Sequence, residues 1–340
     1  MRSRTVETDR LRTHWIESGP EDGIPVVLLH GNLSTGRFFE HLMPGAPDRY
    51  RLIAPDMRGF GDSEPAPIDA TRGLRDWADD AHALVRALGI EQPPHLAGWS
   101  TGGAAVALYA IDRPVASLTL IDPVSPHGFG ATGEDGSPHT PDCAGSGGGA
   151  VNPEFVQRLA ARDRSAEPAS PRSAMTGSYW SPEHREPREE LLLDEVPKTV
   201  VGDDHYPGDS TPSEHWPGFA PGTRGILNAL SPRYCDWSAL VDVDPKPPVL
   251  WTQGTEDRVI ADGSAWEMGW LGESGAIPGW PGADAFPPQP MVRQIAALLE
   301  RYRATGGRVQ VERFDGSGHF PPIDAAERWS RVFFDFLGTC

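Results

Sequence analysis

Cysteine, lysine and long apolar runs are all scarce in this chain of 340 residues. Its three cysteines, Cys143, Cys235 and Cys340, are odd in number and lack the spacing of metal ligands. This pattern argues against a disulfide framework or a metal centre and predicts a reducing compartment. No apolar run approaches the roughly 18 residues that a membrane-spanning helix needs. The N-terminal stretch MRSRTVETDRLRTHW has no apolar core, so we expect no secretory signal and a cytoplasmic location.

Positive charge is scarce as well. Only Lys198 and Lys246 are lysines, and 30 Lys and Arg residues stand against 48 Asp and Glu residues, which gives a net charge of −18. The chain has no basic cluster, and this argues against a nucleic-acid partner, because phosphate backbones are bound by clustered Lys and Arg. The same excess of negative charge is expected to disfavour anionic substrates through long-range repulsion.

Glycine and proline, by contrast, are abundant. The chain holds 38 Gly and 35 Pro, and its hydrophobic content of 38% is modest for its length. Many of these residues fall between positions 123 and 290, where the regular spacing of apolar residues is interrupted. This composition predicts loop-rich insertions in an otherwise folded chain.

Outside that region, short apolar runs alternate with stretches of helical spacing. Continuous apolar runs are typical of buried parallel strands, and we expect strands at Pro25–Leu29, Arg51–Ala54, Pro94–Ala97, Val115–Ile121, Pro248–Gln253 and Val309–Phe314. The expected helices are Leu74–Leu88, Gly103–Ile111, Met291–Tyr302 and Ala325–Leu337. The alternation predicts an α/β fold with a doubly wound, mostly parallel sheet, built from residues 1–123 and 246–340. Residues 124–245 are then an inserted lid of helices and loops, and residues 258–290 an extra loop insertion within the core.

The segment Gly98-Trp99-Ser100-Thr101-Gly102 joins one of these strands to the next helix. Glycines on both sides of a serine suit a very sharp turn, because side chains at those positions would collide as the strand doubles back into the helix. Such a turn lifts the serine hydroxyl above the sheet edge and directs the first N–H groups of the helix at whatever bonds to it. The segment therefore predicts a nucleophilic serine.

Four features together resemble the α/β-hydrolase fold family. They are the turn His30-Gly31-Asn32 after a strand, the Pro-Asp-x-Arg-Gly-x-Gly-x-Ser loop at 55–63, the turn at Ser100, and the late pair Asp257 and His319 at loop ends. The order Ser, Asp, His along the chain is the order that this family uses. The resemblance covers residues 1–123 and 246–340 and implies catalysis without a metal or an organic cofactor.

The resemblance also implies a role for each polar residue. Ser100 is the expected nucleophile, His319 the general base, and Asp257 the acid that orients His319 and stabilises its charged form. Asp122 ends the preceding strand and is a rival for the role of the acid, because some members of the family place it there. Glu256 is a weaker rival.

An oxyanion hole completes the expected site. The backbone N–H groups of Asn32 and Thr101 are the expected donors, and Leu33 takes the place of Asn32 if the loop is shifted by one residue. His30 is expected to be a structural turn residue, and Trp99 to be buried beneath the serine turn.

Aromatic residues are concentrated in the two insertions. We expect them to line an apolar substrate cavity, although they could instead serve only to pack the lid on the core. The residues expected at this cavity are Leu33, Trp180, Trp216, Trp237, Trp270 and Phe320, accompanied by Tyr179, Phe219 and Tyr234.

The serine narrows the expected reaction. Epoxide hydrolases and haloalkane dehalogenases of this family use an aspartate in place of Ser100, which argues against both activities. We expect hydrolysis of a carboxylic ester or lactone of an apolar, neutral substrate through an acyl-enzyme. A C–C bond hydrolase and a cofactor-free perhydrolase are the alternative enzymes, and a non-turnover small-molecule receptor is the alternative outside catalysis. The sequence leaves the oligomeric state open.

Overall fold

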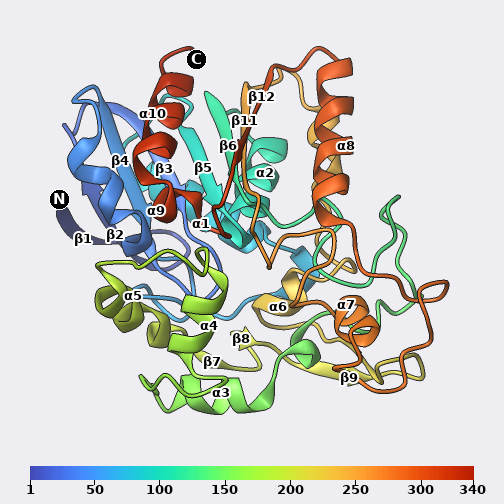
Figure 1. Ribbon diagram of the computed structural model, residues 1–340. Helices are drawn as coiled ribbons and strands as arrows, with labels where there is room; N and C mark the ends of the chain where they lie inside the picture. Colours follow the sequence, from blue (N-terminus) through green and yellow to red (C-terminus); the bar gives the residue numbers. More distant parts are fainter.

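An eight-stranded sheet forms the centre of the computed structural model, which describes residues 1–340 (Figure 1). The strands are β1 (Arg2–Glu7), β2 (Arg12–Ser18), β3 (Ile24–Leu29), β4 (Tyr50–Pro55), β5 (His95–Trp99), β6 (Ser117–Ile121), β11 (Val249–Gly254) and β12 (Val309–Phe314). Their order across the sheet is β1-β2-β4-β3-β5-β6-β11-β12. The pairs β1/β2 and β2/β4 are antiparallel, and all other pairs are parallel. The doubly wound, mostly parallel sheet predicted from the sequence is confirmed.

Helices cover both faces of this sheet (Figure 1). On one face α1 (Arg75–Ala87) packs on α2 (Thr101–Asp112), which lies against β5 and β6, and α8 (Met291–Ala304) lies beside β12. The 3₁₀ helix η1 (Gly36–Gly45) and α10 (Ala326–Leu337) pack together on the other face, with α9 (Pro321–Asp324) leading into α10. The apolar residues of α1 recur every three or four positions and are buried, whereas α2 is buried almost all round because it lies between α1 and the sheet.

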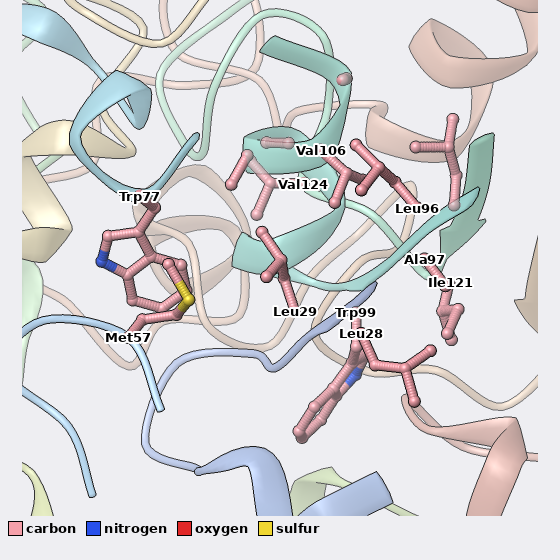
Figure 2. Close-up of a cluster of buried hydrophobic side chains, with 14 of the residues drawn as sticks. Leu28, Leu29, Met57, Trp77, Leu96, Ala97, Trp99, Val106, Ile121 and Val124 are labelled. Carbon is pink, nitrogen blue, oxygen red and sulfur yellow. The ribbon is translucent and has the colours of Figure 1, made fainter. Parts of the chain in front are cut away.

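Successive side chains of β3 point to opposite faces of the sheet. Figure 2 shows Leu29 directed toward Val106 of α2, and Leu28 on the side of Trp99. Both leucines are fully buried. Because both faces are covered, a strand of this sheet needs apolar residues at every position, and this is why β3 appears in the sequence as one continuous apolar run.

Between β6 and β11 the chain leaves the sheet and forms small elements near the carboxyl ends of the strands (Figure 1). The helices there are η3 (Gly148–Ala150), α3 (Pro153–Ala160), α4 (Pro171–Ser178), α5 (Glu189–Glu195), η4 (Val196–Lys198), α6 (Ile226–Ala229) and η5 (Ser238–Asp242). A further short helix, η2 (Ala70–Arg72), lies earlier in the chain, just before α1. Two small sheets pair β7 (Val201–Gly202) with β8 (Tyr206–Pro207) and β9 (Ser210–Pro212) with β10 (Phe219–Pro221).

The segment 258–290 contains α7 (Met268–Glu273) and packs against the segment 124–245. Met268 and Phe286 form a small apolar cluster with Ala131, and the rings of Trp216 and Phe286 meet edge to face with their centroids 4.9 Å apart. The two segments therefore form one layer at the strand ends. None of the helices combines the length and the apolar character that crossing a bilayer requires.

Candidate active site

Ser100 lies at the apex of the turn between β5 and α2, and its backbone is left-handed, with φ 55° and ψ −115°. A Cβ on Gly98 would lie 2.1 Å from the carbonyl oxygen of Gly102, and a Cβ on Gly102 would lie 2.3 Å from that of Leu29. Only glycine fits at either position. The cost of the left-handed serine is offset by this tight packing and by the Ser100 N–H, which donates to the carbonyl of Ile121 at 2.9 Å.

His319 follows β12 and is buried. Its Nδ1 donates to Oδ2 of Asp257 at 2.8 Å, which leaves Nε2 as the proton acceptor of the ring. The second oxygen of Asp257 accepts the N–H groups of Val259 at 2.7 Å and Ile260 at 3.0 Å, so the carboxylate is held from both sides. Ser100 Oγ has no hydrogen-bond partner within the protein. In active sites of this kind the serine–histidine bond often forms only when substrate is bound.

The rival carboxyl group, Asp122, lies beside the same pair. One oxygen or nitrogen of each of Asp122, Asp257 and His319 lies within 4.8 Å of the others. Asp122 is fully buried, and its Oδ1 accepts only the N–H of Gly254, at 2.8 Å. Burial first, and the charge of Asp257 second, raise the pKa of Asp122 well above its usual range. His319 Nδ1 bonds to Asp257 and not to Asp122, so the geometry favours Asp257 as the acid. Glu256 is exposed and does not line the cavity that holds Ser100 and His319.

The N–H groups of Asn32 and Thr101 have no acceptor in the protein, and both residues line one cavity with Ser100 and His319. Thr101 is the first residue of α2, so its N–H points out of the helix and carries the positive end of the helix dipole. His30 is buried and its Nε2 accepts the N–H of Met57 at 3.0 Å. Burial lowers the pKa of His30 to about 4, so this ring stays neutral and structural, as the sequence predicts.

The cavity has an empty volume of about 1030 Å³, including its open mouth, and 15 of its 25 lining residues are hydrophobic. Leu33 lines it, as predicted. The apolar walls away from Ser100 include Phe129, Phe155, Tyr206, Leu227, Leu230 and Trp266, which come from the segments 124–245 and 258–290. Trp266 is 45% exposed and marks the mouth.

Seven aromatic residues expected at this cavity are not among its lining residues: Trp180, Trp216, Phe219, Tyr234, Trp237, Trp270 and Phe320. Phe320 stacks on Trp99 at 4.2 Å, and the indole N–H of Trp237 donates to the carbonyl of Val124 at 3.1 Å. Both rings are fully buried, so their whole apolar surface is removed from water by packing within the protein.

The other five rings also pack against neighbouring parts of the protein. Trp216 contacts Phe286, Trp180 meets His184 edge to face with ring centroids 6.1 Å apart, and Trp270 lies near Gly263. Phe219 lies near Gly149, and the Arg233 guanidinium lies over the ring of Tyr234. The predicted place of these seven residues in the cavity wall is wrong. Trp99 is almost fully buried beneath the serine turn, as predicted, and one edge of it reaches the cavity.

Glu267 is the one carboxyl group in the cavity wall, and the sequence analysis missed it. Its two oxygens accept the N–H groups of Trp270 at 2.7 Å and Gly269 at 2.8 Å, which caps the start of α7. Burial raises the pKa of Glu267 to about 7, against the opposing effect of these backbone N–H groups. An acidic residue ahead of a short helix is a capping signal, but nothing local in the sequence indicates that it is buried.

The chain is similar to known proteins both in sequence and in structure. A family model described as alpha/beta hydrolase fold matches residues 24–283. The magnesium-chelatase 30 kDa subunit of Rhodobacter capsulatus is 36% identical over 118 residues, which are 35% of this chain and 41% of that protein. The cis-3-alkyl-4-alkyloxetan-2-one decarboxylase of Xanthomonas campestris pv. campestris is 42% identical over 96 residues, 26% of this chain and 32% of that protein.

The matches thus span less than half the length of these curated relatives. Among solved structures, an esterase from Rhodococcus sp. ECU1013 has a TM-score of 0.62 at 19% identity, and 99% of each chain is covered. At that level of identity the likeness shows a shared fold.

Proposed function

Since this chain belongs to the α/β-hydrolase fold family, we propose that it is a serine hydrolase that cleaves a carboxylic ester or lactone. The observation that carries the proposal is the placement of Ser100, in a strained turn, at the same cavity as a histidine whose Nδ1 is held by a buried carboxylate. This arrangement leaves Nε2 of His319 available to take the serine proton.

The reaction begins when His319 Nε2 removes the proton from Ser100 Oγ as that oxygen attacks the substrate carbonyl carbon. Asp257 stabilises the imidazolium that forms. The N–H groups of Thr101 and Asn32 stabilise the negative oxygen of the tetrahedral intermediate, and each such donor is worth a factor of about 10²–10³ in rate. His319 then gives its proton to the leaving alkoxide as the C–O bond breaks. Water, deprotonated by His319, hydrolyses the acyl-enzyme and restores Ser100.

The cavity supports a moderately large, apolar and neutral substrate. Its walls are mostly hydrophobic, and Glu267 is the single carboxyl group among its lining residues. The net charge of −18 adds a long-range repulsion that disfavours anions. Leu33, beside the oxyanion hole, would contact the part of the substrate nearest the carbonyl.

Treatment with a fluorophosphonate, followed by intact-mass spectrometry, tests the proposal. We expect one adduct on the wild type and none on Ser100→Ala, whereas Ser178→Ala, which removes another serine hydroxyl from the same cavity wall, still forms the adduct. A parallel panel of p-nitrophenyl esters from acetate to octanoate should show turnover and rank the acyl lengths that the cavity accepts.

The outcomes separate the alternatives. An adduct without turnover of any ester would contradict the ester form of the proposal and favour a lactone substrate, a C–C bond hydrolase or a non-turnover receptor. The absence of an adduct on the wild type would mean that Ser100 is not activated, and the enzyme proposal would fail with it.

A further inference from the structure

Tyr179 follows α4 in the segment 124–245, yet its hydroxyl reaches the loop that carries the proposed oxyanion hole. This O–H is shared between the carbonyl oxygens of Asn32, at 3.0 Å, and Leu33, at 3.1 Å. The ring lines the catalytic cavity and is buried. A residue far away in the sequence thus holds the backbone on the carbonyl side of Asn32.

The loop needs such a contact. Leu33 has φ 53°, a left-handed conformation that a residue with a β-carbon rarely adopts. Strained residues of this kind persist only where the surroundings fix them. The hydrogen bonds from Tyr179 fall on both sides of Leu33, so they fix the torsion angles of Leu33 and the orientation of the peptide that directly follows Asn32. The peptide that carries the Asn32 N–H is held from its other side, because Ser34 Oγ donates to the carbonyl of Gly31 at 2.7 Å.

The ring of Tyr179 is itself held firmly. It meets Trp99 edge to face at 4.9 Å and Phe38 at 5.8 Å between ring centroids. Trp99 directly precedes Ser100, so one side chain connects the nucleophile turn with the oxyanion loop. Burial raises the pKa of Tyr179 well above its usual range, so its hydroxyl is a donor at every working pH.

We propose that Tyr179 is a positioning residue, which holds Asn32 and Leu33 so that the oxyanion hole matches the tetrahedral intermediate. The inference rests on the proposed serine-hydrolase function. The oxyanion hole then depends on two parts of the protein. Its N–H donors lie at the ends of the sheet strands, and the side chain that positions them lies in the inserted segment.

The test replaces Tyr179 by phenylalanine and compares it with a matched control, Tyr302→Phe. Tyr302 is also buried, and its hydroxyl donates to the carbonyl of Pro247 at 2.7 Å, far from the cavity. Each variant therefore loses one buried hydroxyl donor and keeps its ring. We expect similar shifts of Tm in the two variants.

Only Tyr179→Phe should lose catalysis. We expect kcat for p-nitrophenyl esters to fall roughly 10- to 100-fold with KM within about twofold, because a misplaced donor weakens transition-state binding without changing the cavity. Rates are taken per Ser100 titrated by fluorophosphonate, so that unfolded protein does not imitate the loss. An alkyl boronic acid, which forms a tetrahedral adduct on the serine, should bind Tyr179→Phe more weakly by the same factor, and a non-hydrolysable ether of the same chain length should bind both variants equally.

Equal kcat values for Tyr179→Phe and Tyr302→Phe, in a wild type that turns over esters, would overturn the positioning role and leave the serine hydrolase intact. Equal loss of boronic acid and ether binding would also overturn it, because that result indicates a damaged cavity rather than a misplaced donor. A wild type without turnover or adduct would instead overturn the proposed function.

Discussion

Replacing Glu267 by glutamine should change the pH dependence of stability. Burial raises the pKa of this carboxyl group to about 7 from an ordinary value of 4.5. The folded protein thus binds this proton more tightly than the unfolded chain does, and the bound proton stabilises the folded state. This stabilisation has its full value below pH 4.5 and is lost as the pH rises through about 7. Each factor of ten in proton affinity is worth about 1.4 kcal/mol, so ionised Glu267 costs the folded state about 3 kcal/mol.

The measurement is urea unfolding, followed by tryptophan fluorescence, at pH 5 and pH 8.5. Between these values the free energy of unfolding of the wild type should fall by about 2.5 kcal/mol more than that of Glu267→Gln. The glutamine loses one cap acceptor for α7, which costs about 1 kcal/mol at every pH and leaves the difference between pH values unaffected. Glu300→Gln is the control, because Glu300 is exposed on α8, away from α7, and this variant should show the pH dependence of the wild type. Equal pH dependence in the wild type and Glu267→Gln would refute the reasoning.

Four further substitutions test the choice of the acid and the packing of the serine turn. Asp257→Asn should lower kcat by a factor of about 10⁴, because the amide no longer stabilises the imidazolium. Asp122→Asn should cost less than about tenfold, because Asp122 makes no hydrogen bond to His319. Steady-state kinetics with the reverse order would reassign the acid. Gly98→Ala should abolish the folded protein, because its Cβ would lie 2.1 Å from the carbonyl oxygen of Gly102. Gly45→Ala, with nothing within 4 Å of the added Cβ, should melt as the wild type does in circular dichroism, and the same melting curve for Gly98→Ala would contradict the packing of the turn.

The sheet and the positions of Ser100, Asp257 and His319 could be predicted because their signals are local. The strand expected at Pro25–Leu29 is β3 (Ile24–Leu29), since a strand buried on both faces has apolar residues at successive positions. Ser100, Asp257 and His319 each directly follow a strand or its adjoining turn, and parallel strands bring their carboxyl ends to one edge of the sheet. Strand position alone therefore brings these three side chains together.

The cavity walls could not be predicted in the same way. Trp216 and Phe129 both lie in the segment 124–245, but Trp216 packs on Phe286 and only Phe129 lines the cavity. The fold of this segment depends on distant contacts, such as Asn228, whose side chain accepts the N–H groups of Gly148 and Gly222. A sequence pattern indicates that an aromatic residue is apolar and will be buried. It does not indicate whether the ring will pack on another segment or line the cavity.

The bond from Tyr179 to the loop at Asn32 and Leu33 has a consequence for how this protein could acquire a new substrate. Most residues that line the cavity belong to the segments 124–245 and 258–290, whereas the proposed catalytic residues follow strands of the sheet. Exchanging the segment 124–245 for one from another protein would change most of the residues that line the cavity and leave the proposed catalytic residues in place. Such a transplant would also leave two backbone carbonyls without their donor, so it would have to carry a hydroxyl to the same place or be accompanied by a redesigned loop.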